Sequence, residues 1–342
     1  MAFDYINQIP TPEEIKTMIP LSQELKDLKA KRDHEISKVF KGESDKFILI
    51  IGPCSAHDEE AVVEYVKRLA VLQEKVRDKV VLIPRVYTNK PRTTGEGYKG
   101  MLHQPVPMDE PNILKGIKAI RNMHIRIMSE TGLTAADEML YPMNYPYLDD
   151  VLSYVAVGAR SVENQQHRLA VSGMEVPAGM KNPTGGDMGV MLNSIKAAQI
   201  SHRFIYNGFE VQTSGNNYAH GILRGAVNQY GRNIPNYHFE DLMFLRKKYT
   251  ERGLDNQAII IDSSHANSMK KYEQQPRICM EVMRSRNHDD GIKKMVKGLM
   301  IESYLIEGKQ DECGIEFGKS ITDACLGWEE SEALILEIAN NV

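Results

Sequence analysis

The stretch "KFILIIGPCSAHDEEAVVEYVKRL" (Lys46–Leu69) decides the fold, because it joins a strand pattern directly to a helix pattern. Its first part, "FILII" (47–51), is short and apolar at every position, as expected for a strand of a parallel sheet that helices cover. The turn "GPCSAHD" (52–58) follows, and its last residue, Asp58, suits the N-cap of a helix that opens with two glutamates. The stretch therefore predicts a strand followed by a helix, with a cysteine in the turn between them.

The same order of patterns recurs along the rest of the chain. The candidate strands are the short apolar runs 47–51, 80–86, 133–138, 154–159, 177–181, 203–206, 258–262 and 298–303. Helical patterns lie between them, as in 109–132, 188–199 and 239–253. Eight strand–helix units in about 300 residues favour an α/β fold of the (β/α)8 TIM barrel type. A doubly wound open sheet is the alternative, in which the number eight would be accidental.

Two regions fall outside a minimal barrel. Residues 1–45 contain "TPEEIKTMI", in which Thr11 suits an N-cap and Pro12 the first helical position, so we expect an N-terminal helical extension. The second region, 207–225, has turn residues at its centre between two extended arms and predicts a β-hairpin inserted after strand 6. The catalytic barrel itself is then expected to span 46–342.

Composition excludes several classes of protein. Among 342 residues, 42 Lys and Arg face 46 Asp and Glu, so nothing indicates a nucleic-acid or anionic-membrane partner. The longest apolar run is about six residues, far too short to span a bilayer. We also expect no secretory signal, because "MAFDYINQIP" lacks a basic segment followed by an apolar one. Four scattered cysteines favour a reduced, cytoplasmic protein: Cys54, Cys279, Cys313 and Cys325.

Four potential metal ligands follow neighbouring strands if the barrel closes. Cys54 follows the first strand, His265 follows the seventh, Glu302 ends the eighth, and Asp323 lies in the loop beyond it. Alone, each has a simpler interpretation: a buried cysteine, a helix cap, or a solvated carboxylate. Together they make a set for one divalent metal ion. Mn, Fe, Co and Zn all tolerate such a set, whereas the sulfur disfavours Mg and Ca.

Cations gather at the predicted ends of the other strands. The six positions are Arg85, Lys90, Arg92, Arg160, Lys181 and Arg224. Each alone would be an ordinary surface cation, but six at one rim repel one another unless anions lie among them. Guanidinium groups bind phosphate and carboxylate oxygens in pairs, so we expect ligands with several negative charges. Lys181 has an alternative role as a Schiff-base nucleophile, although a metal site would then be redundant.

Six motifs together resemble one enzyme family. They are "GPCSAHD", "KPRTT", "GARSVENQQHR", "GMKNPTGG", "IDSSHAN" and "GKSITDACLGW". In this order they are similar to the 3-deoxy-D-arabino-heptulosonate 7-phosphate (DAHP) synthases, type I alpha group, over about Lys46 to the C-terminus. The resemblance implies a metal-dependent condensation of phosphoenolpyruvate with erythrose 4-phosphate. DAHP and phosphate are the implied products, and the reaction opens the shikimate pathway.

The resemblance also implies roles for individual residues. The implied metal ligands are Cys54, His265, Glu302 and Asp323. The implied phosphoenolpyruvate clamp is Arg85, Lys90, Gly158, Ala159, Arg160, Lys181 and Arg224. The implied tetrose phosphate segment is Lys90, Pro91, Arg92 and Thr93. Glu138 matches a carboxylate near the reacting centre, and Lys90 is the candidate proton donor, with Lys181 or a metal-bound water as alternatives.

The sequence departs from the family in two places. The common segment KPRTTVGWKG is here "KPRTTGEGYKG", one residue longer and with Tyr98 in place of Trp, so no role is carried over from Thr94 onward. Residues 1–45 match only in kind. In regulated members such an extension, with the hairpin, forms an aromatic amino-acid inhibitor site at a subunit interface. We therefore expect a homodimer or homotetramer, with Phe, Tyr and Trp all open as inhibitor.

Two alternatives remain at this point. The related 3-deoxy-octulosonate 8-phosphate synthase uses arabinose 5-phosphate, but that branch typically carries a different sequence in place of "KPRTT". A catalytically silent regulator that binds an aromatic amino acid on the same scaffold is the other. The complete sets of metal ligands and cations disfavour it, because a sensor has no use for them.

Overall fold

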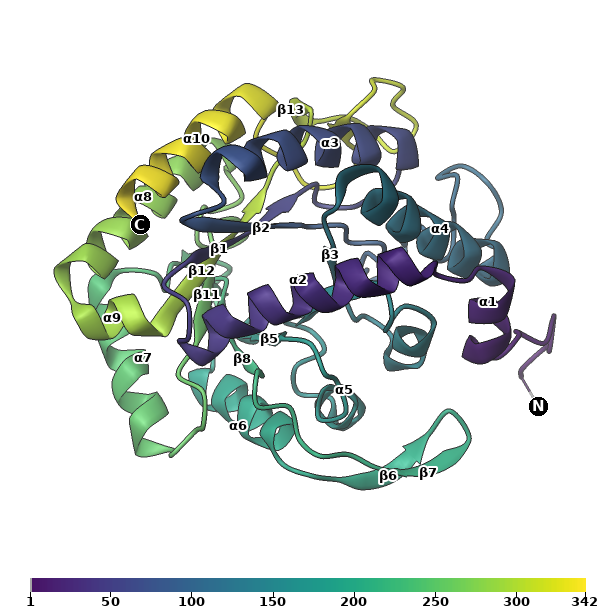
Figure 1. The fold of residues 1–342 in the computed structure, drawn as a ribbon, viewed down its shortest axis with the longest axis horizontal. Helices are drawn as coiled ribbons and strands as arrows, with labels where there is room; N and C mark the ends of the chain where they lie inside the picture. Colours follow the sequence, from purple (N-terminus) through teal and green to yellow (C-terminus); the bar gives the residue numbers. More distant parts are fainter. Residues whose placement is uncertain (1) are drawn as a thin grey trace.

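A closed ring of eight parallel strands forms the centre of the molecule in the computed structural model, which describes residues 2–342. The strands run in the order β2-β1-β12-β11-β8-β5-β4-β3, and a parallel bridge between Arg85 and Ala136 joins the two ends of this sheet. Their bounds are β1 Phe47–Gly52, β2 Val80–Pro84, β3 Ala135–Glu138, β4 Leu152–Val157, β5 Ala178–Lys181, β8 His220–Leu223, β11 Ile259–Asp262 and β12 Val296–Glu302. The predicted (β/α)8 barrel is confirmed (Figure 1).

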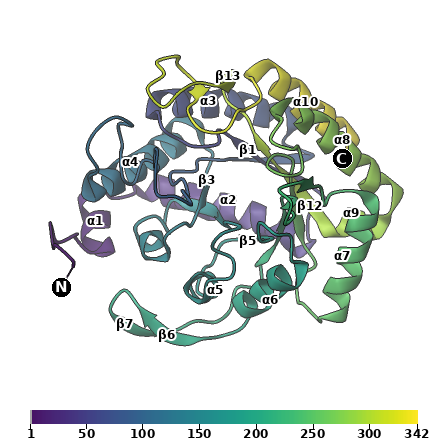
Figure 2. The same cartoon turned by 180° about the vertical axis from the view of Figure 1, so that it is seen from behind.

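Helices surround the ring on its outer side (Figure 2). They are α3 Glu59–Val76, α4 Ile113–Thr131, α5 Gln165–Val171, α6 Met188–Gln199, α7 Phe239–Glu251, α8 Gln275–His288, α9 Asp290–Met295 and α10 Trp328–Asn341. Asp58 caps α3 as predicted, because its side chain accepts a hydrogen bond from the backbone N–H of Ala61 at 3.2 Å. No helix within the described part of the chain is long and apolar enough to cross a membrane.

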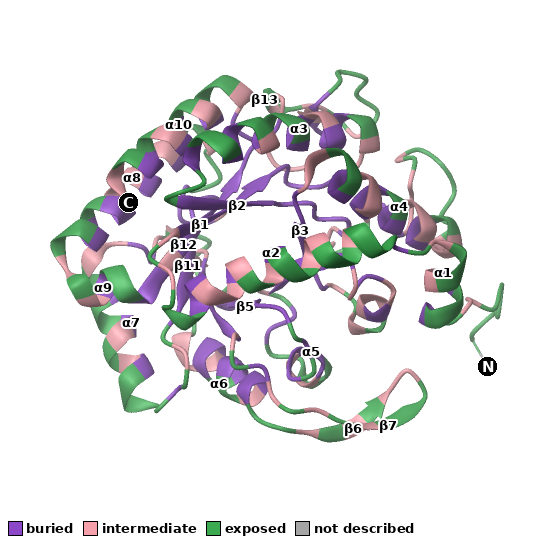
Figure 3. Ribbon diagram, viewed as in Figure 1, coloured by how far each residue is buried: buried purple, intermediate pink, exposed green. Residues whose placement is uncertain are grey.

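The first strand shows why the barrel strands are apolar on both faces. Leu49 and Ile51 belong to the outer core between sheet and helices, whereas Ile48 and Ile50 belong to a second core inside the barrel. Successive side chains of a strand point to opposite faces, and both faces here are covered. The barrel strands are accordingly buried at every position except the half-buried Lys297, while the helices expose one side to solvent (Figure 3).

The N-terminal extension covers one end of the barrel. It contains α1 (Pro12–Met18), capped by Thr11 as predicted, and α2 (Gln23–Lys41). The α2 helix runs across the opening at the amino ends of the strands (Figure 1). Its Ile36, Val39 and Phe40 join the core inside the barrel, so α2 forms the floor of that core.

The predicted position of strand 6 and of the hairpin was wrong. Residues Arg203–Tyr206 form β6, which pairs antiparallel with β7 (Phe209–Gln212) in a hairpin outside the barrel. The sixth barrel strand is β8, so the hairpin precedes that strand. The burial pattern gives the reason: β6 alternates between exposed and half-buried residues, whereas all four residues of β8 are buried. The other seven predicted strands overlap the observed barrel strands.

Short elements complete the fold. They are the 3-10 helices η1 (Pro142–Tyr147) and η2 (Tyr272–Gln274), and the strand pairs β9 (Ala226–Val227) with β10 (Asn233–Ile234) and β13 (Ile306–Lys309) with β14 (Lys319–Ser320). The β9–β10 and β13–β14 pairs lie in the loops that follow β8 and β12, at the carboxyl end of the barrel. Active sites of this fold lie at that end.

Candidate active site

The four predicted metal ligands come from adjacent strands at the carboxyl end of the barrel. β12 lies between β11 and β1, and Gly52 pairs in register with Glu302. Cys54 follows β1, His265 follows β11, and Asp323 lies in the loop after β14. The barrel closure therefore brings the start and the end of the chain together here, as the sequence predicted.

Cys54 and Asp323 are in direct contact. Sγ of Cys54 lies 3.4 Å from Oδ2 of Asp323. A metal bound at about 2.3 Å from sulfur and about 2.1 Å from oxygen, with a bond angle of roughly 90–110°, requires a separation of roughly 3.1–3.6 Å. These two atoms therefore suit a shared ion. No group of three or more His, Cys, Asp or Glu side chains within residues 2–342 stands in metal-binding geometry, so only two of the four candidates are brought within contact distance.

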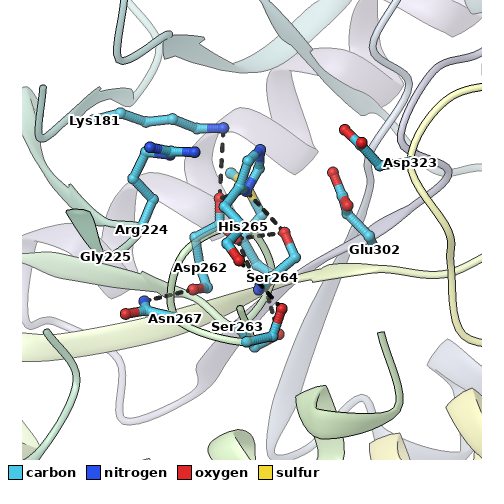
Figure 4. Close-up of polar contacts among 12 residues, drawn as sticks. Lys181, Arg224, Gly225, Asp262, Ser263, Ser264, His265, Asn267, Glu302 and Asp323 are labelled. Atoms are coloured by element: carbon cyan, nitrogen blue, oxygen red, sulfur yellow. Dashed lines mark hydrogen bonds and ion pairs between the residues drawn. The ribbon is translucent and has the colours of Figure 1, made fainter. Parts of the chain in front are cut away.

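His265 and Glu302 have partners that orient them. Nδ1 of His265 lies 2.9 Å from Oδ2 of the buried Asp262, which leaves Nε2 free for another ligand. Metal-binding imidazoles commonly have such a carboxylate on the second nitrogen. Glu302 pairs with the Arg85 guanidinium at 3.1 Å. The carboxylates of Glu302 and Asp323 both point toward the side on which His265 lies (Figure 4). The sulfur, nitrogen and oxygen atoms of these four side chains thus suit a divalent ion in their chemistry, while only Cys54 and Asp323 lie at a separation that one shared ion requires.

Lys90 sets the electrostatics of this corner. Its ammonium lies 2.8 Å from Sγ of Cys54 and 2.9 Å from Oδ2 of Asp323. Burial opposes the charge of Lys90, but Cys54 and Asp323 outweigh it and raise the pKa of the ammonium. Burial likewise opposes the charge of Asp323, yet Lys90 holds the pKa of that carboxyl below its usual range. The corner therefore favours a positive charge beside the thiol and the carboxylate.

Arg85 and Lys181 both lie close to one aromatic ring, that of Tyr87. The Arg85 guanidinium stacks 3.7 Å from the centroid of Tyr87, and Nζ of Lys181 lies 5.4 Å from it. Lys181 also lies 3.5 Å from Asp262. Nε of Arg85 is buried without a hydrogen-bond partner within residues 2–342. Both side chains are thus held inside the barrel mouth with donor capacity to spare.

Arg224 is the clearest anion-binding candidate. It directly follows β8, and its backbone N–H donates to Oδ1 of Asn182 at 2.9 Å. Its Nη1 is buried and lacks a hydrogen-bond partner in the described part of the chain. Burial lowers the pKa of Arg224; the charge of Asp262 opposes this shift, and the charge of nearby Arg160 adds to it. A buried guanidinium nitrogen without a partner, next to a like charge, is unfavourable unless an anion binds there.

Glu138 ends β3 and contacts the first residue after β4, Gly158. A Cβ at position 158 would lie 2.1 Å from Oε1 of Glu138, so only glycine leaves room for this carboxylate. Beside it, burial raises the pKa of Asp137 to about 7 although Thr88 donates two hydrogen bonds to it. Glu138 thus has a fixed place at the carboxyl end of β3, and its role near the reacting centre stays a prediction.

The "KPRTT" segment forms a loop at the same end. The predicted tetrose phosphate residues lie in it, with Lys90, Pro91 and Arg92 half-buried and Thr93 exposed. Ala159 and Arg160 likewise lie in the turn after β4, with Arg160 exposed. All predicted site residues therefore belong to one end of the barrel.

A family model described as "DAHP synthetase I family" matches residues 18–336. The chain belongs to the DAHP synthetase I family. The Phe-sensitive phospho-2-dehydro-3-deoxyheptonate aldolase of Escherichia coli (strain K12) is 37% identical over 345 residues, which cover 98% of this chain and 95% of that relative. The Tyr-sensitive enzyme of the same strain is 36% identical over 339 residues, 96% of this chain and 91% of the relative.

A solved DAHP synthetase I relative has the same fold. The structure of phospho-2-dehydro-3-deoxyheptonate aldolase from Francisella tularensis SCHU S4 superposes with a TM-score of 0.92 at 30% identity, covering 99% of this chain and 98% of that one. The Trp-sensitive E. coli (strain K12) relative is 33% identical over 346 residues, 98% of this chain and 96% of the relative. The resemblance to this family, inferred from six motifs, is confirmed along nearly the whole chain.

Two residues of this DAHP synthetase I site were missed by reasoning from the sequence. Asp262 is fully buried at the end of β11 and contacts both His265 and Lys181. A signal existed, because a carboxylate at the end of an apolar strand, three positions before His265, is unusual. Glu312 accepts a hydrogen bond from Arg92 across 220 positions of sequence, and no local pattern indicates such a contact.

Proposed function

We propose that this chain is a 3-deoxy-7-phosphoheptulonate synthase, which condenses phosphoenolpyruvate with erythrose 4-phosphate in the presence of water and yields DAHP and phosphate. The observation that carries the proposal is Nη1 of Arg224, which is buried, lies near Arg160 and has no hydrogen-bond partner among residues 2–342, because such a nitrogen calls for an anion at the carboxyl end of the barrel. The relatives are named phospho-2-dehydro-3-deoxyheptonate aldolases, which is another name for the same enzyme, and this supports the proposed reaction.

The cations bind and orient the two substrates in this proposal. Phosphoenolpyruvate carries a phosphate and a carboxylate. We assign these groups to Arg85, Lys90, Arg160, Lys181 and Arg224, with the backbone at Gly158 and Ala159. We assign the tetrose phosphate to Lys90, Pro91, Arg92 and Thr93. Two polyanions repel each other, so the surrounding cations offset that repulsion and hold the reacting carbons together.

The reaction then proceeds by carbon–carbon bond formation. The enol carbon of phosphoenolpyruvate attacks the aldehyde carbon, and Lys90 donates a proton to the resulting alkoxide. Water adds to the oxygen-bearing carbon, and cleavage of the carbon–oxygen bond releases phosphate. Glu138, fixed opposite Gly158, is the carboxylate we place beside that carbon. Lys181 holds a second proton near the same centre and is the alternative donor.

We propose a divalent metal ion (Mn, Fe, Co or Zn) with Cys54, His265, Glu302 and Asp323 as ligands. The 3.4 Å contact between Sγ of Cys54 and Oδ2 of Asp323 supports this set, as does the Asp262 carboxylate behind His265. When bound, such an ion supplies a Lewis acid that polarises the aldehyde oxygen or orients water. The four free thiols of the chain support a cytoplasmic location.

We further propose feedback inhibition by an aromatic amino acid and a homodimer or homotetramer. Relatives are named Phe-, Tyr- and Trp-sensitive. Exposed apolar side chains on the N-terminal segment and the hairpin support a contact between subunits there. These side chains are Phe3, Tyr5, Ile6, Ile205 and Phe209. The identity of the inhibitor is left to the experiment below.

Steady-state kinetics test the proposal. Phosphoenolpyruvate is supplied with erythrose 4-phosphate or with arabinose 5-phosphate, and loss of the enol and release of phosphate are followed. We expect faster turnover with the tetrose, and lower turnover when one of Phe, Tyr or Trp is added. Faster turnover with the pentose would assign the chain to the octulosonate branch. No turnover with either sugar would leave an amino-acid-binding regulator.

A further inference from the structure

Glu312 lies in the loop between β13 and β14 and contacts the "KPRTT" loop. Its Oε1 accepts hydrogen bonds from Nη2 of Arg92 and from the backbone N–H of Tyr98, both at 2.9 Å. One carboxylate oxygen thus joins two loops that lie more than 200 positions apart in the sequence. A carboxylate that accepts hydrogen bonds from both a guanidinium and a backbone N–H fixes the direction of the guanidinium as well as its distance.

The contact closes a ring of hydrogen bonds around Arg92. Nε of Arg92 donates to the backbone carbonyl of Tyr98 at 2.8 Å, while Nη2 reaches Glu312. The loop itself is a narrow hairpin, in which Lys90 N–H donates to Lys99 at 3.0 Å. Two of the three guanidinium nitrogens are therefore held by the protein. The third, Nη1, has no hydrogen-bond partner within residues 2–342.

Gly97 makes room for the ring. Its φ is +81°, a left-handed conformation that favours glycine. A Cβ at this position would lie 2.9 Å from Oε1 of Glu312 and 3.3 Å from Cζ of Arg92. Gly97 belongs to "GEGYKG", the part of the loop that is longer than the common family segment. The contact with Glu312 therefore depends on a glycine in the part of the loop that is one residue longer than the common family segment.

We propose that Glu312 is a positioning residue that holds Arg92 so that its free Nη1 faces the phosphate of the incoming tetrose. This inference rests on the proposed function, which assigns that phosphate to Arg92. The side chains of Arg92 and Glu312 are 26% and 42% exposed, so their ion pair contributes little to folding. The main effect of Glu312 is to orient Arg92. Loss of Glu312 therefore weakens binding of erythrose 4-phosphate and leaves binding of phosphoenolpyruvate unchanged.

Three variants test this role by steady-state kinetics with each substrate varied in turn. Glu312→Ala removes both hydrogen bonds, and we expect KM for erythrose 4-phosphate to rise about tenfold because Arg92 loses its fixed geometry. KM for phosphoenolpyruvate, kcat and the melting temperature stay near the wild-type values. Glu312→Gln keeps an oxygen that accepts both bonds, so it restores KM to within about threefold of wild type. Gly97→Ala displaces the Glu312 carboxylate and reproduces the selective rise.

Glu316→Ala is the matched control. Glu316 lies in the same loop with the same charge, and the partner of its side chain within residues 2–342 is Lys319. We expect it to leave both KM values unchanged.

An unchanged KM for erythrose 4-phosphate in Glu312→Ala overturns the inference, as does an equal rise in KM for both substrates. A lower KM also overturns it, since Glu312 would then merely compete with the phosphate. If the wild-type protein does not turn over erythrose 4-phosphate, both the proposed function and this inference are wrong. If the wild type is active and Glu312→Ala has an unchanged KM for erythrose 4-phosphate, the inference alone is wrong.

Discussion

Nζ of Lys90 lies 2.8 Å from Sγ of Cys54, near the start of the chain, and also contacts Asp323, near its end. Burial raises the pKa of the Cys54 thiol, and the charge of Glu302 raises it further. Acidic groups crowded in this way are stabilised by a cation among them. The corner therefore attracts positive charge whether it comes from an ammonium or from a metal ion.

Replacing Cys54 tests the predicted metal site. We expect Cys54→Ala to lose metal affinity by about 100-fold or more, since removing even an outer partner of a ligand costs roughly 10–100-fold. Circular dichroism should show a folded protein, because the change removes only one small buried side chain. Metal bound per chain is measured after dialysis. Cys279→Ala is the control, because Cys279 is buried in α8 among apolar side chains. Equal metal content in the two variants would mean that Cys54 serves only in packing.

Removing the metal tests its role in catalysis. We expect EDTA followed by gel filtration to abolish turnover, and added Mn²⁺ or Co²⁺ to restore it. Mg²⁺ and Ca²⁺ should restore far less, because hard ions bind poorly to a thiolate. The rate of phosphate release is measured before and after each addition. Full turnover in a preparation shown to contain no metal would contradict this prediction.

Arg160 tests the phosphoenolpyruvate clamp. We expect Arg160→Ala to raise KM for phosphoenolpyruvate about tenfold or more, since a hydrogen bond to a charged group contributes about 1.5–3 kcal/mol. Initial rates are measured with phosphoenolpyruvate varied at saturating tetrose. Arg77→Ala is the control, because this exposed arginine follows α3 and forms an ion pair with Glu74 at the surface. An unchanged KM in Arg160→Ala would exclude Arg160 from the clamp.

His124 makes the stability of the fold depend on pH. It is buried in α4, and neither ring nitrogen has a hydrogen-bond partner within residues 2–342. Burial lowers the pKa of His124 to about 3, so the folded state keeps the ring neutral while the unfolded chain protonates it below about pH 6.5. The unfolded state then binds more protons, and the free energy of unfolding falls as the pH drops from about 6.5 toward 3.

The variant His124→Leu removes this dependence. Between pH 7 and pH 5, we expect its free energy of unfolding to fall by about 2 kcal/mol less than that of the wild type. Urea unfolding at the two pH values measures the difference. His34→Leu is the control, because the His34 ring is exposed on α2. Identical pH dependence in His124→Leu and wild type would show that another group is responsible.

Much of the barrel could be predicted because its strands carry a local signal. A run such as Phe47–Gly52, apolar at every position, indicates a strand covered on both faces wherever it occurs. Strand β8 failed this test, since "HGIL" begins with a polar residue and a glycine and resembles the arm of a hairpin. Its burial follows from its neighbours β5 and β11, which the local sequence does not reveal.

The site was predictable where residues follow strands and unpredictable where loops meet. Closure of the ring placed Cys54 beside Asp323, because strand order alone determines which strand ends are neighbours. The contact between Arg92 and Glu312 depends on the path of two irregular loops. Loop paths are determined by side-chain contacts that no periodic pattern encodes, so Glu312 was found only in the structure.

The floor formed by α2 has a consequence for how the protein is made. During translation, Ile36 and Phe40 leave the ribosome early. Met300, which belongs to the same core, emerges almost at the end. The apolar face of α2 therefore lacks its final partners until nearly the whole chain has left the exit tunnel. A truncated protein that starts at β1 would lack α2, so the core inside the barrel would be exposed to water at the amino ends of the strands.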